Sequence, residues 1–337
     1  MRTTVDGAQK PVGSNVCESA ATQVQVSVSR TDALARFAWL VMAYNIAVIL
    51  WGAYVRATGS GAGCGSHWPL CNGEILPSTA QSQTLIEFTH RVTSGLSLVL
   101  VSALLIWCWR STAKGEWPRY SAVSAAVLLF NEALLGAMLV ISAYVGINQS
   151  ASRAVILCLH FGNTLLLVAA LTLTAKWLSS GPRRFVPAAK HYDWTMIGFG
   201  LLSIMATGMT GSLAALGDTI FPAATLRASI TQDFSSSSHV LLRLRLFHPV
   251  TAAIAFLYVL WMVYSLSKSR EQSSRTLPFL TTIVVAQLAL GVLNVLLLAP
   301  VWLQITHLLV AELLWIVLVL ASSEILLKTA EPLLKTG

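Results

Sequence analysis

The sequence predicts an all-α polytopic membrane protein of eight transmembrane helices, arranged as two tandem parallel-repeat four-helix bundles. Three observations predict this class: the composition, a series of long uncharged apolar segments, and a set of features that recurs in both halves of the chain. Hydrophobic residues make up 55% of the 337 residues and charged residues only 11%. Soluble domains need more charge than this on their surfaces, so a membrane protein is expected.

Long apolar segments set the number of spans, because each is close to the roughly 20 residues that a helix needs to cross hydrocarbon. Inside lipid every backbone amide must be paired within the protein, so each span is expected to be a helix. The segments without a charged residue are 37–55, 92–109, 154–175, 194–216, 246–266 and 277–311. The last is long enough for two spans broken at Pro300, and residues 120–144 form a further span interrupted only by Glu132. The total is eight.

The net charge of +8 indicates orientation rather than a nucleic-acid partner. Lys and Arg residues concentrate before the first span and after the second, fourth, sixth and eighth spans, which all lie on one side of the membrane. Basic loops stay in the cytoplasm, or in the matrix of a mitochondrion. Both termini are therefore predicted to be cytoplasmic.

An internal repeat divides the chain, since four features recur in the same order in each half. In the first half they are TGS at 58–60, His90, LLGAMLV at 134–140 and His160, and in the second half TGS at 210–212, His248, LALGVLNVL at 288–296 and His307. A unit with an even number of spans keeps its orientation when it is duplicated, so the repeat axis should run along the membrane normal.

Five segments follow from the repeat and the charge distribution. They are a polar cytoplasmic tail at 1–32, an N-terminal four-helix repeat at 33–180, a basic cytoplasmic linker at 181–193, a C-terminal four-helix repeat at 194–326 and a cytoplasmic tail at 327–337. The first tail lacks the apolar core of a signal peptide. We expect it to be disordered, with a short mitochondrial transit segment as the alternative.

The four histidines of the repeat are the first candidate site. Their spans begin on the outer side, so His90, His160, His248 and His307 are expected within roughly the first two turns, at one depth. One histidine on an apolar helix is more often a packed residue, but four at repeat-related positions favour a cofactor. Zinc or copper would usually draw Cys, Asp or Glu ligands at close spacing. Two imidazoles facing each other across a helical bundle suit the two axial positions of a haem iron.

The outer loop between the first two spans is the second candidate site. It reads GSGAGCGSHWPLCNGEILP, with Cys64 and Cys71 on the oxidising side of the membrane, where a disulfide is permitted. The two cysteines could instead be a dithiol that exchanges with a redox partner, or a transient metal site that includes His67.

These segments resemble one known family. The segments GAYVRATGSGAGCGSHWPLCNG at 52–73, IEFTHR at 86–91 and LHFGNT at 159–164, with the repeated histidines, resemble haem A synthase over about residues 36–324. The resemblance implies that a ring methyl of haem O is oxidised to the formyl group of haem A by two successive hydroxylations, for terminal oxidase biogenesis. It also implies the bacterial inner membrane, with the mitochondrial inner membrane less expected. The implied partners are a haem O synthase, terminal oxidase assembly factors and an unidentified electron donor, and a homo-oligomer is compatible with it.

The resemblance also assigns roles to residues. It makes His90 and His160 the axial ligands of the substrate haem O, and His248 and His307 the axial ligands of the iron of a resident haem b that passes electrons. It makes Glu87, three residues before the first histidine, the catalytic residue. Because three residues are nearly one helical turn, Glu87 and His90 should project on the same side of their helix.

The two repeats differ at this position, because Arg245 stands three residues before His248. An arginine suits a haem propionate or a structural ion pair and cannot act as a base. The difference favours chemistry in the first repeat and electron transfer in the second. Arg56, Arg91 and Arg245 are further candidates to support the haem sites.

Two features depart from the family pattern. The loop at 217–239 has no cysteine, whereas some members carry a second cysteine pair between the fifth and sixth spans. Pro249 follows His248, where an arginine is common in the family. Since proline is tolerated in the first turn of a helix, His248 is expected closer to its helix start than His90.

Two other functions explain part of the sequence. A dihaem b-type cytochrome that relays electrons from quinol would use the same histidines, but it gives no reason for the Glu87/Arg245 difference. A transporter built on the duplicated bundle would contain no haem, so a visible absorbance spectrum of the purified protein separates it from the other two.

Overall fold

The computed structural model describes residues 14–78, 81–181, 185–187, 189–269 and 276–329. Within these residues eight segments are long and apolar enough to cross a membrane, which confirms the predicted class and number of spans. The membrane-length helices are α1 (Ser14–Ala57), α2 (Ser82–Ser111), α3 (Trp117–Ile141), α4 (Ala151–Ser179), α5 (His191–Ile220), α7 (Val240–Arg245) together with α8 (Phe247–Ser269), α9 (Thr276–Leu296) and α10 (Val301–Leu326).

Local sequence explains several helix boundaries. Pro300 is the residue immediately before α10, as the predicted break between the last two spans requires. Pro118 lies in the first turn of α3, where its missing N–H costs no helical hydrogen bond. The sixth span is divided into α7 and α8 just before Pro249. His248 is therefore in the first turn of α8, closer to a helix start than His90 in α2, as predicted.

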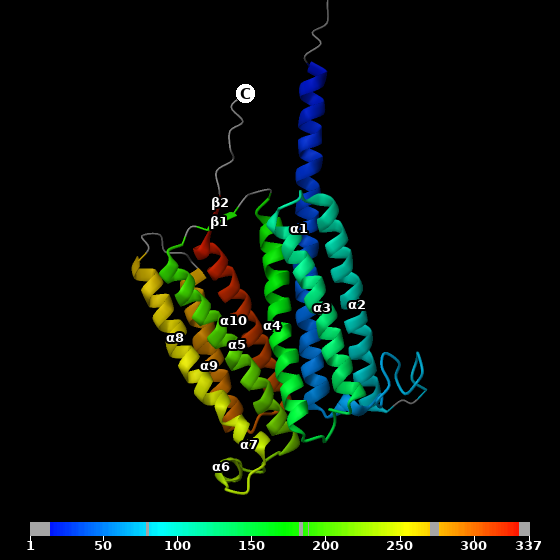
Figure 1. The fold of residues 1–337 in the computed structure, drawn as a ribbon, viewed down its shortest axis with the longest axis vertical. Coiled ribbons are helices and arrows are strands. Elements are labelled where there is room, and N and C mark those ends of the chain that lie inside the picture. Colours follow the sequence, from blue (N-terminus) through cyan, green and yellow to red (C-terminus); the bar gives the residue numbers. More distant parts are fainter. Residues whose placement is uncertain (1–13, 79–80, 182–184, 188, 270–275, 330–337) are drawn as a thin grey trace, which may run out of the picture.

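The spans pack as two rings of four helices (Figure 1). In the first half α1 contacts α2, α2 contacts α3, α3 contacts α4, and α4 returns to α1. In the second half α5, α8, α9 and α10 contact each other in the same cyclic order. The halves meet chiefly where α4 lies against α5 and α10. Two copies of one four-helix unit would have this arrangement.

A shared core joins the two halves. Ile46 of α1 and Leu165 of α4 belong to the same buried cluster as Val259, Leu280 and Leu318 of the second half. On the outside of the bundle many large apolar side chains are exposed, which in water would be unfavourable but in lipid is required. The burial pattern is therefore that of a membrane bundle.

Both described ends of the chain lie at the same end of the bundle (Figure 1). We call the opposite end the outer end, following the predicted orientation. The chain is helical from Ser14 and continues without a break into the first span, which corrects the expected disordered tail; residues 1–13 lie outside the described residues. A stable span removes the cost of nucleating a helix, so the preceding residues extend it cheaply.

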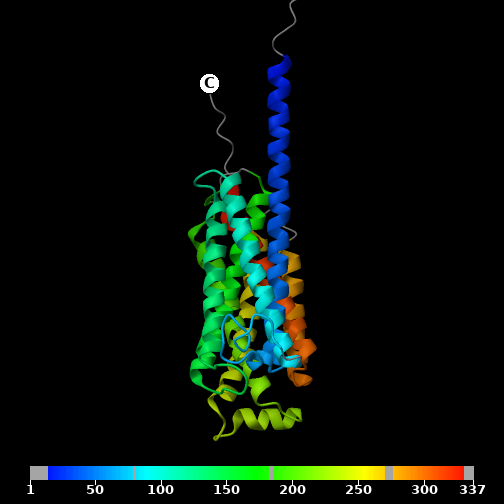
Figure 2. The same cartoon turned by 90° about the vertical axis from the view of Figure 1, so that its right-hand side faces the viewer.

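Two further features were not predicted: a pair of short strands and a short helix outside the spans. Strand β1 (Phe185–Pro187), in the linker between the halves, pairs antiparallel with β2 (Leu327–Thr329), directly after the last span. At the outer end, the short helix α6 (Leu226–Phe234) lies across the second half (Figure 2). Neither has the long apolar run that identifies a span, so the hydropathy pattern does not show them.

Candidate functional site

The four candidate histidines lie towards the outer ends of α2, α4, α8 and α10. His90 and His160 are about three turns into their helices, slightly deeper than predicted. Helices α2 and α4 each contact both α1 and α3, so they stand diagonally across the first ring; α8 and α10 do the same in the second. Each half therefore holds its two histidines on opposite sides of one bundle, as two axial ligands require.

Each histidine faces a glycine of a neighbouring helix. A methyl group at Gly52 of α1 would lie 2.9 Å from Cε1 of His90, and one at Gly211 of α5 would lie 3.0 Å from Cε1 of His248. The first distance is shorter than real Cβ contacts and the second is tighter than most of them, so a larger residue at either position would force the histidine ring to shift. Glycine therefore forms a notch for the first histidine of each half.

The second histidine of each half has a looser version of the same contact. A methyl group at Gly136 would lie 3.9 Å from Cε1 of His160, and one at Gly291 would lie 3.4 Å from Cε1 of His307. The sequence contained a signal for these two glycines, because they are the glycines of LLGAMLV and LALGVLNVL. Sequence reasoning used these segments only as evidence of duplication and missed their contact with the histidines.

One repeat feature is not positionally equivalent in the two halves. Thr58 follows the end of α1, whereas Thr210 lies inside α5. The matched pair is Gly52 and Gly211, because each contacts the first histidine of its half. The two TGS segments therefore have the same sequence but do not occupy equivalent positions in the two halves.

The second pair has the geometry of two ligands of one iron. The ring centroids of His248 and His307 are 6.4 Å apart, and the ring planes lie at 81° to each other. Two imidazoles on opposite faces of one metal, with metal–nitrogen bonds of about 2 Å, have centroids roughly 6 Å apart. Nδ1 of His248 donates to the carbonyl of Thr207 at 3.1 Å, which leaves Nε2 with the free lone pair. These residues fit an axial haem ligand set.

The remaining histidine nitrogens differ in their partners. Nε2 of His307 lies 3.3 Å from the amide nitrogen of Gln287, and its Nδ1 is buried without a hydrogen-bond partner. Nδ1 of His90 is also buried without a partner. Nδ1 of His160 is likewise buried without a hydrogen-bond partner, and the carboxylate of Glu132 lies 3.2 Å from it, within ion-pair distance. A buried imidazole nitrogen without a partner is costly, so each unpaired Nδ1 is open to a further hydrogen bond.

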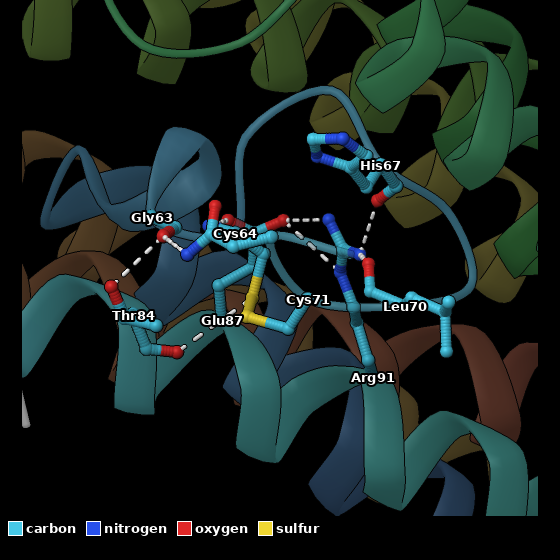
Figure 3. Close-up of polar contacts among 9 residues, drawn as sticks. Gly63, Cys64, His67, Leu70, Cys71, Thr84, Glu87 and Arg91 are labelled. Atoms are coloured by element: carbon cyan, nitrogen blue, oxygen red, sulfur yellow. Dashed lines mark hydrogen bonds and ion pairs between the residues drawn. A yellow bond between two sulfur atoms is a disulfide. The ribbon is translucent and has the colours of Figure 1, made fainter. Parts of the chain in front are cut away.

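The outer loop is closed by a disulfide between Cys64 and Cys71 (Figure 3). It lies directly on the start of α2, because the hydroxyl of Thr84 donates to the carbonyl of Gly63 at 2.8 Å. A methyl group at Gly63 would come within 2.5 Å of the backbone of Gln83. No cluster of three metal-ligand side chains occurs among the described residues, so the disulfide is the arrangement that the structure supports.

Glu87 and Arg91 hold this loop on α2 (Figure 3). The side chain of Glu87 is buried; one oxygen accepts from the backbone N–H of Cys64 at 2.8 Å and the other from Arg91 at 2.6 Å. Arg91 also donates to the backbone carbonyls of His67 and Leu70. We call this set the Glu87–Arg91 clamp. His67 contributes its carbonyl to the clamp.

The second half holds its outer loop with the charges reversed. Arg245 donates to Asp218 of α5 at 2.7 Å and also binds Asp233 and Ser229 of α6. Of the two roles expected for this arginine, the structure shows the ion pair. Arg56 has another role, because it bonds the carbonyl of Ala215 at 2.6 Å and links the two halves.

Residues 35–319 match the family described as "Cytochrome oxidase assembly protein", COX15-CtaA. A Thermus thermophilus protein named protoheme IX farnesyltransferase is 42% identical over 301 residues, which cover 88% of this chain and 49% of that protein. Proteins named heme A synthase are 43% identical over 126 residues in Bacillus licheniformis, covering 37% of this chain and 39% of that protein, and 35% identical over 161 residues in Geobacillus kaustophilus, covering 47% and 48%. The chain spans about half or less of the length of these relatives.

Proposed function

The chain belongs to the COX15-CtaA family of cytochrome oxidase assembly proteins, the haem A synthase family, and from that premise we propose that it converts haem O to haem A. The observation that carries this proposal is the pair of histidines in each half, on opposite helices of a membrane bundle and each against a glycine. Two such pairs would hold two haems at similar depth. The proposed reaction is two successive hydroxylations of one ring methyl group of haem O.

The two pairs have different proposed roles. His90 and His160 hold the substrate, haem O, and His248 and His307 hold a resident haem b. Haem b, when bound, supplies one-electron transfer. The chain prepares this second site by directing Nδ1 of His248 to a backbone carbonyl, which leaves Nε2 available for iron.

For Glu87 we propose a role at the first site that depends on the outer loop. Its position one turn before His90 supports a carboxylate near the substrate, where it would stabilise positive charge developing on the oxidised methyl carbon or position a water. Its two oxygens accept from Cys64 and Arg91, so the same carboxylate also holds the outer loop against α2. A test of catalysis must therefore separate these two effects.

The proposed partners follow from the reaction. Haem O is made by farnesyl transfer to protohaem, and this chain matches about half of a protein named protoheme IX farnesyltransferase. That match supports a haem O synthase as the source of substrate. A terminal oxidase assembly pathway, served by an electron donor yet to be identified, would receive the product. The eight spans support a multi-pass membrane protein, for which we propose the bacterial inner membrane.

Pigment analysis of the full chain tests the proposal. The protein is co-expressed with a haem O synthase, and extracted haems are separated by chromatography. We expect haem A with the native chain and none with Glu87→Gln, which keeps the size of the side chain. Native protein that binds haem but accumulates only haem B and haem O would overturn the proposal in favour of an electron-relaying cytochrome. Purified protein without haem absorbance would overturn both.

The variant needs a control for the loop. If Glu87→Gln retains the thermal stability and the haem absorbance of the native protein but makes no haem A, the carboxylate acts in the reaction. If stability falls together with haem A formation, Glu87 acts through the clamp.

A further inference from the structure

A second buried carboxylate lies behind a histidine of the first pair. Oε1 of Glu132, on α3, lies 3.2 Å from Nδ1 of His160 and accepts from the hydroxyl of Thr164. Its other oxygen accepts from the amide of Asn163 at 2.5 Å. Asn163 and Thr164 are both buried, so this contact is built into the interface of α3 and α4.

The surrounding groups show that this site is made for a hydrogen-bond acceptor. The oxygen of the Asn163 amide accepts from Asn131, and one hydrogen of its nitrogen is directed to the carbonyl of Leu128. The second hydrogen on that nitrogen must therefore face Glu132. A carboxylate, which accepts only, fits this position.

Among the described residues of the second half, no such network surrounds the corresponding position. Gln287 stands at the place of Glu132, because each lies four residues before the glycine that faces the second histidine of its half. By this alignment Asn131 corresponds to Ala286. Asn163 and Thr164, three and four residues after His160, correspond to Val310 and Ala311, three and four residues after His307. Gln287 contacts Nε2 of His307, not Nδ1. The two halves thus differ in the charge, the support and the contacted nitrogen of this residue.

We infer that Glu132 is a positioning residue that makes the two haem sites unequal, an inference that rests on the proposed haem-binding function. Its carboxylate holds Nδ1 of His160 as the donor, so that Nε2 is the nitrogen left for iron. A hydrogen bond from Nδ1–H to a carboxylate raises the basicity of a ligating imidazole. A more strongly donating ligand stabilises ferric over ferrous iron and lowers the reduction potential at the first site.

The test compares haem potentials with the first site isolated. In full-length protein carrying His307→Ala, a haem bound with two axial histidines reports on the first pair. Its midpoint potential is measured by spectroelectrochemistry with Glu132 intact and with Glu132→Gln. We expect a positive shift in the glutamine variant, with the low-spin spectrum kept. The matched control is Gln287→Leu, which should leave this potential unchanged.

A second measurement, on haem-free protein, complements the midpoint potentials. With ¹⁵N-labelled histidine in the haem-free protein, we expect Nδ1 of His160 to carry its proton, and Glu132→Ala to make the two tautomers interchange. A merely structural role of Glu132 would lower thermal stability without moving either the tautomer or the potential.

Different outcomes would contradict the role of Glu132 and the proposed haem-binding function. Native protein that binds no haem through its histidines would overturn the proposed function and the inference with it. Haem bound by His90 and His160 with the same potential in Glu132→Gln would overturn the inference alone. A shift of equal size in Gln287→Leu would also overturn it, because the effect would not belong to the first half.

Discussion

In the first half of the molecule a carboxylate on α2 holds the outer loop, and in the second half an arginine at the start of the sixth span does so. Glu87 and Arg245 both stand three residues before the first histidine of their half. Glu87 binds the disulfide loop together with Arg91, whereas Arg245 binds Asp218 and Asp233. The position that carries opposite charges in the two repeats therefore anchors the outer loop in both.

The Glu87/Arg245 difference therefore has a structural interpretation as well as a functional one. From the sequence, the difference separated a reacting site from an electron-transfer site. In the structure, Glu87 and Arg245 also carry opposite charges that each anchor an outer loop. That loop is closed by a disulfide in the first half and contains α6 in the second. Loss of activity on changing Glu87 is therefore insufficient to establish catalysis.

The largest expected effect is that of Glu87→Ala. It removes both carboxylate oxygens of the clamp and leaves Arg91, whose side chain is only 11% exposed, without an anionic partner. Removing one member of a buried ion pair costs about 3–5 kcal/mol. We expect a lower thermal unfolding temperature in detergent. An exposed carboxylate of the same loop is the control, because Glu74→Ala should change the unfolding temperature little. Equal losses in both variants would contradict the clamp.

A smaller effect is expected from opening the disulfide. Cys64→Ser with Cys71→Ser removes a bond whose kind typically contributes about 2–4 kcal/mol, while the Glu87–Arg91 clamp remains. Limited proteolysis, with the cut sites identified by mass spectrometry, should show faster cleavage in this loop and unchanged cleavage around α6. If the α6 region also becomes sensitive, the two outer loops are not independent.

The two histidines of the first half should respond differently when the glycine that faces each ring is replaced by alanine. Gly52→Ala places a methyl group against His90, so we expect an overpacking cost of about 1–3 kcal/mol and loss of haem from the first pair. Gly136→Ala is the matched control, since its methyl group would lie at ordinary contact distance from His160. The haem absorbance per mole of purified protein measures the haem content of each variant. Equal haem content in the two variants would show that the notch is unimportant.

The smallest effect is expected from Asp218→Asn. Arg245 keeps Asp233 and Ser229, so the loss should be only about 1 kcal/mol. The double variant with Asp233→Asn should lose much more than the sum of the single losses, because Arg245 is then left without an anionic partner. Thermal unfolding of the two single variants and the double variant measures this. Strict additivity would mean that the two aspartates act separately.

Several features of the fold were predictable because they are local. The eight spans follow from runs of apolar residues, and the break at Pro300 follows from the missing N–H of proline. The helix at 14–31 and α6 were missed for the same reason, since neither has the apolar run of a span. Strands β1 and β2 pair residues from distant parts of the chain, which no local pattern encodes.

The candidate site was predictable in its residue types but not in its contacts. By itself the sequence determined the four histidines, their pairing by repeat and the cysteine pair of the outer loop. Only the tertiary structure decided that Glu87 meets Cys64 and Arg91, that Glu132 meets His160, and that a glycine faces each ring. The physical reason is that these contacts join different helices or a helix and a loop, and depend on how each helix is rotated about its axis. That rotation is set by the packing of the whole bundle.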